Sequence, residues 1–135
     1  RGIENVGYGR IYITNNLIEE NGTGIYNFGA SPIITNNSIG NNTLDGVYNG
    51  SHSGAISVPI LEGNVITDNG RYGIADGNPV IIHNKITGNG TSDVNLYPWP
   101  GTSHNISFNV FDTIMGSGAV GNYNVSSDGT PISLQ

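Results

Sequence analysis

Residues 13–25 have the sequence ITNNLIEENGTGI, and this stretch contains the pattern that decides the fold. Within it, Ile13 is followed after two residues by Asn16 and then by Ile18. A second Asn, Asn21, comes five residues after the first, and a Gly-Ile pair closes the stretch. Short apolar runs therefore alternate with Asn and Gly, the residues that favour tight turns between strands.

The same pattern recurs along the chain with a period of about 20 to 27 residues. Its first Asn recurs as Asn16, Asn37, Asn64, Asn84 and Asn109, and its second as Asn21, Asn42, Asn69 and Asn89. A repeat of this length accommodates about three short strands and three turns, and copies that stack in parallel lie about 4.8 Å apart. We therefore predict an all-β parallel solenoid of about five coils, forming a single domain over residues 1–135.

The recurring first Asn has a structural explanation. Its carboxamide contains both a donor and an acceptor, so copies in successive coils can hydrogen-bond along the rod. Asn also adopts the left-handed backbone conformation at low cost, which suits a bend between strands. We predict that Asn16, Asn37, Asn64, Asn84 and Asn109 form a structural ladder and that they occupy such bends.

The motifs I-x-x-N-x-I, N-G-x-x-G-I and P-I, repeated over nearly the whole chain, resemble those of right-handed parallel β-helix proteins of the pectin-lyase-like superfamily. The resemblance implies right-handed coils, in agreement with the general preference for right-handed crossovers. The superfamily includes pectate lyases, polysaccharide hydrolases, epimerases, phage tailspikes and many non-catalytic surface proteins. The resemblance therefore implies the fold, whereas activity has to be argued from a site.

Both ends of the sequence fall inside a coil. Residues 1–3 fit the Gly-Ile column, and Pro131-Ile132 fits the opening of a new coil. We expect a domain without caps, whose edges are covered either by further coils of a longer solenoid or by copies stacked head to tail through its ends. Residues 94–121 depart from the period and are expected to form an irregular, loop-bearing coil.

Composition excludes several classes of partner. The chain has four Lys and Arg against ten Asp and Glu, with a formal net charge of −6. So few basic residues cannot follow a phosphate backbone, and no apolar stretch is long enough for a membrane-spanning helix. The absence of Cys excludes disulfides and thiolate metal sites. We expect neither a nucleic-acid partner nor membrane insertion.

No constellation of catalytic residues is evident. No column contains carboxylates in two consecutive coils, and no acidic cluster accompanies Arg71 or Lys85. His52, His83 and His104 are widely separated and are expected at the surface or in turns. We therefore predict no catalytic residue, no metal and no cofactor, and hence no enzyme. The alternative is a polysaccharide-active β-helix whose catalytic coils lie outside this segment.

Aromatic residues indicate carbohydrate as a partner. Tyr26 and Tyr48 each follow an inward residue, so they should face outward in adjacent coils about 5 Å apart. Together with Tyr97 and Trp99 they would form a stacking surface for a glycan. The acceptor sequence N-x-[ST] occurs at Asn21, Asn36, Asn41, Asn49, Asn89, Asn105 and Asn124, in turn columns expected to be exposed enough for glycosylation. We predict a non-catalytic structural or adhesive module, extracellular or at the cell surface.

Overall fold

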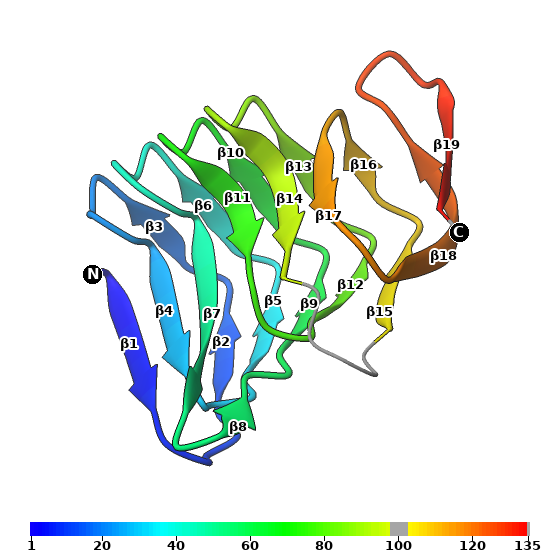
Figure 1. The fold of residues 1–135 in the computed structure, drawn as a ribbon. Helices are drawn as coiled ribbons and strands as arrows, with labels where there is room; N and C mark the ends of the chain where they lie inside the picture. The colour runs from blue at the N-terminus through cyan, green and yellow to red at the C-terminus, as the bar shows by residue number, and fades with distance from the viewer. Residues whose placement is uncertain (98–102, 135) are drawn as a thin grey trace.

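The protein is a right-handed parallel β-solenoid in which each coil adds one strand to each of three parallel stacks (Figure 1). The structure, a computed structural model, describes residues 1–97 and 103–134. The chain passes through about five coils, which confirms the predicted all-β solenoid. The described residues contain no helix, and therefore none of a length and hydrophobicity suited to crossing a membrane.

Strands from successive coils pair in register within each stack. The first stack, at the front of Figure 1, contains β1 (Ile3–Val6), β4 (Ile25–Phe28), β7 (Val47–His52), β11 (Tyr72–Ala75), β14 (Ser92–Leu96) and β17 (Ile114–Gly116). The second contains β2 (Tyr12–Thr14), β5 (Ile33–Thr35), β9 (Ile60–Glu62), β12 (Val80–Ile82) and β15 (His104–Ser107). The third contains β3 (Leu17–Glu19), β6 (Ser38–Gly40), β10 (Val65–Thr67), β13 (Lys85–Thr87) and β16 (Val110–Phe111). Strand β18 (Ala119–Val125) pairs with both β15 and β16.

The core consists of aliphatic columns that follow the strand register. Each strand is so short that one or two side chains point inward, and the inward residue is almost always Ile, Val or Leu. The columns contain Ile25, Val47, Ile74 and Val94 in the first stack, Ile13, Ile34, Leu61, Ile81 and Ile106 in the second, and Ile18, Ile39, Ile66, Ile86 and Phe111 in the third. Burial of each such side chain stabilises the fold by about 1.5–3 kcal/mol.

The main Asn ladder runs along the corner between the second and third stacks. Each side-chain nitrogen donates to the side-chain oxygen one coil further on, at 3.0 Å from Asn16 to Asn37, 3.0 Å from Asn37 to Asn64 and 2.9 Å from Asn64 to Asn84. The ladder continues through Asn109 and extends to Asn124. Asn37, Asn64, Asn84 and Asn109 are therefore each bonded to the ladder Asn before and the ladder Asn after, which fixes the register of the coils.

The residue with a left-handed backbone at this corner is the one before the ladder Asn. The prediction that the ladder Asn residues themselves adopt this conformation is therefore wrong. Positive φ angles occur at Asn15, Asn36, Gly63, His83, Phe108 and Tyr123. The bend thereby directs the next side chain inward, where its amide bonds to the adjacent coil. The ladder Asn itself is selected for hydrogen bonding, and the residue before it makes the turn.

The C-terminal segment corrects a second expectation. Strand β19 (Pro131–Leu134) does not open a new coil but folds back and pairs antiparallel with β18. A tight turn causes the reversal, because the Ser126 N–H donates to the Thr130 carbonyl at 2.8 Å and Gly129 has a φ of 87°. Ile132 and Leu134 are partly buried and pack against the core.

Residues 94–121 are also more regular than expected. Strands β15, β16 and β17 stack on β12, β13 and β14 in register. The repeat therefore continues through this region, and only residues 98–102, which contain Trp99, lie outside the described residues.

Candidate functional site

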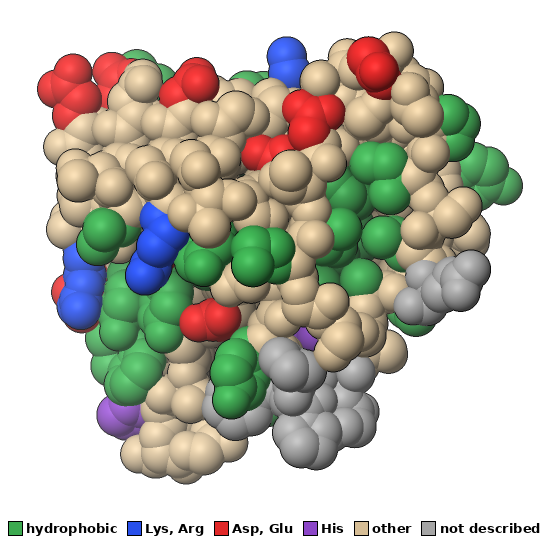
Figure 2. Space-filling view, turned by 45° about the horizontal axis from the view of Figure 1, so that its top comes forward, with side chains coloured by type: hydrophobic (Ala, Val, Ile, Leu, Met, Phe, Trp, Pro, Cys, Tyr) green, Lys and Arg blue, Asp and Glu red, His purple; other side chains and the backbone are tan. Residues whose placement is uncertain are grey.

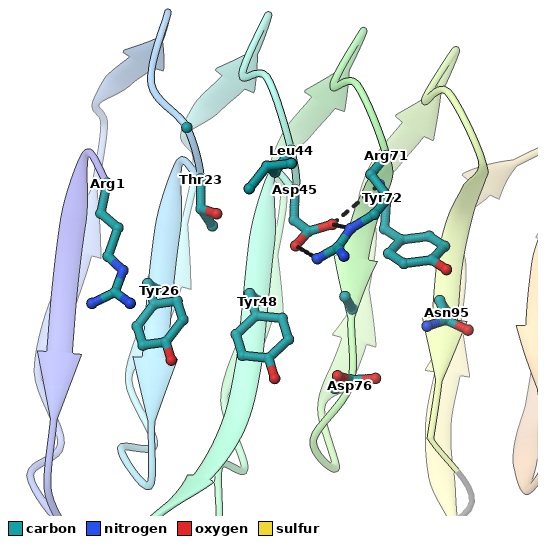
Figure 3. A pocket seen from close by; sticks show the side chains of 12 residues that line it. Arg1, Thr23, Tyr26, Leu44, Asp45, Tyr48, Arg71, Tyr72, Asp76 and Asn95 are labelled. Carbon is teal, nitrogen blue, oxygen red and sulfur yellow. Dashed lines mark hydrogen bonds and ion pairs between the residues drawn. The ribbon is translucent and has the colours of Figure 1, made fainter.

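The candidate site is an open groove on the outer face of the first stack. Since side chains alternate along a strand, the residue after each inward aliphatic points out, and register places Tyr26 beside Tyr48, followed by Ala75 and Asn95. The groove has a volume of about 590 Å³ and is bordered by Arg1, Asp45, Arg71 and Asp76 (Figure 3). We call it the tyrosine groove. Figure 2 shows hydrophobic side chains gathered on this side, with basic side chains along their border.

Two stacked tyrosines form the floor of the groove. The ring centroids of Tyr26 and Tyr48 are 5.2 Å apart with planes inclined by 18°. Phe28 extends the surface at 6.0 Å from Tyr26, and His52 contacts Phe28 edge-on at 5.2 Å. The Arg1 guanidinium lies 3.7 Å from the Tyr26 ring centroid. The aromatic surface therefore continues over two neighbouring strands, with Tyr26 and Phe28 on β4 and Tyr48 and His52 on β7.

An ion pair between the buried Asp45 and the exposed Arg71 closes one side of the groove. Asp45, only 1% exposed in its side chain, accepts hydrogen bonds from Arg71 Nε at 2.8 Å and from Arg71 Nη2. It also accepts from the backbone N–H of Tyr72 at 3.3 Å. The hydrogen bond that Arg71 donates to the Asp45 carboxylate raises the pKa of the Arg71 guanidinium. One edge of the guanidinium, formed by Nε and Nη2, is thus bound in a bidentate pair within the protein.

Asp76 lies at the other side, where β11 ends. It adopts a left-handed conformation with a φ of 59°, and Gly77 follows with a φ of 70°. Burial, and then the charge of Asp45, raises the pKa of the Asp76 carboxyl, while Arg71 and a hydrogen bond with Tyr48 act in the opposite direction. Burial and the charge of Asp76 likewise raise the pKa of the Tyr48 hydroxyl. Asp76 is therefore a half-buried carboxylate at the edge of an aromatic surface (Figure 3).

The groove includes two of the four aromatic residues proposed from the sequence, Tyr26 and Tyr48. Tyr26 and Tyr48 stack as expected from the register, and Tyr97 lines a second hollow that shares Tyr48 and Asp76 with the groove. Trp99 lies outside the described residues. The described residues form no group of three or more His, Cys, Asp or Glu side chains that could hold a metal ion.

The seven glycosylation acceptors are not equally accessible. Asn36, Asn41 and Asn105 are exposed, and Asn21 and Asn89 are half-buried. Asn49 and Asn124 are 1% exposed, and their side-chain nitrogens donate to backbone carbonyls of Ala75 and Ile106. The expectation that these turn columns are exposed is therefore wrong at Asn49 and Asn124, because both side chains belong to hydrogen-bonded ladders.

The histidines also differ from expectation at one position. His83 is exposed and stacks on Phe108, and His52 lies at the end of the aromatic surface. His104, expected at the surface or in a turn, is completely buried. Register places it in the column of the buried Pro59 and Pro79, which explains its burial. Burial lowers the pKa of the His104 imidazole, partly opposed by a hydrogen bond to the backbone of Tyr97.

Sequence reasoning missed the pair of Asp45 and Arg71. The two residues are separated by 26 positions, and Arg71 comes two residues before Gly73, whereas Asp45 directly precedes Gly46. When the two coils are aligned on Gly46 and Gly73, Asp45 lies opposite Tyr72. Its cationic partner Arg71 is one position earlier, so the pair does not share a column. A search that allows a shift of one residue between coils would have found it.

Comparison with known proteins gives one match. A family model described as "Right handed beta helix region" matches residues 1–130. No curated protein and no solved structure matches the chain.

Proposed function

The chain belongs to the right-handed β-helix family, and from that premise we propose that it is a carbohydrate-binding adhesive module whose ligand lies in the tyrosine groove. The observation that carries the proposal is the stacked pair of Tyr26 and Tyr48 on an open outer face. Sugar rings present C–H groups on their flat faces, and aromatic side chains offer apolar surface that packs against these faces. The hydroxyl of Tyr can at the same time hydrogen-bond to water or to the ligand.

Polar groups beside the rings support the choice of carbohydrate over an apolar ligand. Asn95, Asp76 and the Tyr48 hydroxyl border the aromatic surface and offer donors and acceptors for sugar hydroxyls. The groove is open along the stack, which suits an extended chain rather than an enclosed small molecule. The proposed location is outside the cell or at its surface, where an adhesive module would meet extended glycan chains.

The proposal is tested by retention of the protein in gels that contain polysaccharide. Tyr26→Ala or Tyr48→Ala should each weaken binding by about 2 kcal/mol, roughly 30-fold in Kd, as is typical for an aromatic residue at the centre of a contact. Tyr12→Ala is the matched control, because Tyr12 is 73% exposed on β2, in a different stack. Equal retention of all variants on every polysaccharide tested would refute the proposal.

Cleavage of the bound glycan is the second candidate function, and Asp76 favours it. A half-buried carboxyl whose pKa is raised by burial is suited to donate a proton to a glycosidic oxygen. The primary proposal predicts no new reducing ends when the protein is incubated with a glycan that it retains. Reducing ends that appear with the unaltered chain and disappear with Asp76→Asn would establish the hydrolytic function instead.

A further inference from the structure

A smaller hollow adjoins the tyrosine groove at the turned end of β7. It has a volume of about 220 Å³ and combines three aromatic rings with one carboxylate, from Phe28, Tyr48, Tyr97 and Asp76. The rest of its lining is Asn49, Gly50 and Ser51. It therefore differs from the groove in its chemistry, because aromatic rings and a single acid line it and, among the described residues, no basic side chain does.

Gly50 keeps this hollow open. A Cβ atom at position 50 would lie 2.8 Å from Cδ2 of Phe28 and 3.0 Å from Cε1 of Tyr48. The two rings thus lie directly over the glycine, and any larger side chain would displace them. The Gly50 carbonyl accepts hydrogen bonds from the Ser57 N–H at 3.2 Å and the Ser57 hydroxyl at 2.7 Å, which holds the floor in place.

The acid in this hollow has no cationic partner among the described residues. The nearby guanidinium of Arg71 is engaged by Asp45, and that of Arg1 is engaged by Glu4. None of the ion pairs formed by the described residues includes Asp76. Its carboxylate is half-buried, so a cation entering the hollow would neutralise a charge that water solvates only in part.

We propose that the hollow binds an organic ammonium group. Aromatic faces attract ammonium ions through their quadrupoles, and cages of aromatic rings with an acidic residue are a recurring solution for such cations. The group comes from one of two sources, the charged amine of an amino sugar held in the tyrosine groove or a free trimethylammonium compound. The amino-sugar source rests on the proposed function, whereas the ammonium pocket itself does not.

The test compares Asp76→Asn with Asp68→Asn. Both aspartates have left-handed backbones, with φ angles of 59° and 57°, and Asn adopts this conformation readily, so neither change strains the chain. Asp68 is exposed, in the corner that precedes ladder residue Asn69, far along the coil from the hollow. Calorimetric titrations use tetramethylammonium chloride, a glucosamine oligomer and the matching N-acetylglucosamine oligomer, the last of which has no charged amine.

The proposal predicts that the glucosamine oligomer binds more tightly than its acetylated counterpart, and that Asp76→Asn removes this preference with at least a tenfold rise in Kd. Asp68→Asn should bind like the unaltered chain. Tetramethylammonium binding that Asp76→Asn abolishes, without a preference for glucosamine, would support the pocket and assign the free trimethylammonium source. No binding of either cation would overturn the inference. If the acetylated oligomer still bound through Tyr26 and Tyr48, the carbohydrate-binding function would stand without it.

Discussion

Substitution of Asn64 by Ala should destabilise the fold far more than the same change at Asn16. The Asn64 side chain donates to the carbonyls of Ile34 at 2.8 Å and Glu62 at 3.2 Å and to the Asn84 side chain at 2.9 Å. Its oxygen accepts from the backbone and side-chain nitrogens of Asn37 at 2.9 and 3.0 Å. These bonds are buried or partly buried, so water cannot replace most of them.

The magnitude follows from these bonds. Each contributes about 1 kcal/mol net, and a buried group left without a partner costs about 1–3 kcal/mol. The Asn37 N–H and the Ile34 carbonyl would both lose their side-chain partner, while Asn37 keeps two other side-chain bonds, to Ile13 and Thr35. We expect a loss of about 3–5 kcal/mol for Asn64→Ala.

Asn16 provides the internal control. It is exposed, and its side chain donates only to Thr14 and Asn37 among the described residues. Asn16→Ala should therefore cost no more than about 1 kcal/mol. Urea denaturation followed by far-UV circular dichroism measures both values. Equal losses for the two variants, or a loss below about 1 kcal/mol for Asn64→Ala, would refute the view that the ladder holds the coils in register.

Three further predictions concern the groove and the assembly. Asp45→Ala should lower the free energy of unfolding by about 1–3 kcal/mol, measured in urea, since the Tyr72 N–H loses its buried acceptor; an unchanged midpoint would contradict this. Asp76 faces Asp45, Arg71 and Tyr48, and its pKa is raised above the ordinary value of 3.8. Just above pH 3.8, the Asp76 carboxyl therefore keeps its proton in the native chain but has lost it in the unfolded chain. The free energy of unfolding should therefore fall as the pH rises through this window, and Asp76→Asn should remove that part of the slope in thermal melts; an unaltered slope would count against the burial of this carboxyl. Self-association through the solenoid ends stays a prediction, and sedimentation velocity over a range of concentrations should show species larger than 14.2 kDa, whereas a single monomer boundary would exclude it.

The sequence predicts most of the scaffold because the repeat determines the register. Once the Asn of each coil are aligned, the inward aliphatic columns and the stacking of Tyr26 on Tyr48 follow from the alternation of side chains along a strand. Where the period is interrupted, prediction fails. The pair of Asp45 and Arg71 is hidden by a shift of one residue at a turn.

Two other errors have local causes. Pro131-Ile132 has the same pattern as the start of a coil, but the preceding Asp128-Gly129 is a hairpin signal, and a reversal at this turn pairs β19 with β18. His104 was expected at the surface or in a turn, yet it occupies the column of the buried Pro59 and Pro79. Asp76 was not recognised because its position depends on a turn with two left-handed residues, Asp76 and Gly77, which the repeat does not specify.

The most direct test of the carbohydrate-binding account is an NMR titration of the aromatic ring signals with an oligosaccharide that the protein retains. Figure 3 shows Tyr26 and Tyr48 side by side on the groove floor, and the account predicts that the signals of these two rings shift together as ligand is added. The stacked rings of Phe108 and Tyr123, 4.9 Å apart at another corner, should not shift. Shifts at Phe108 and Tyr123 with unchanged signals from Tyr26 and Tyr48 would contradict it.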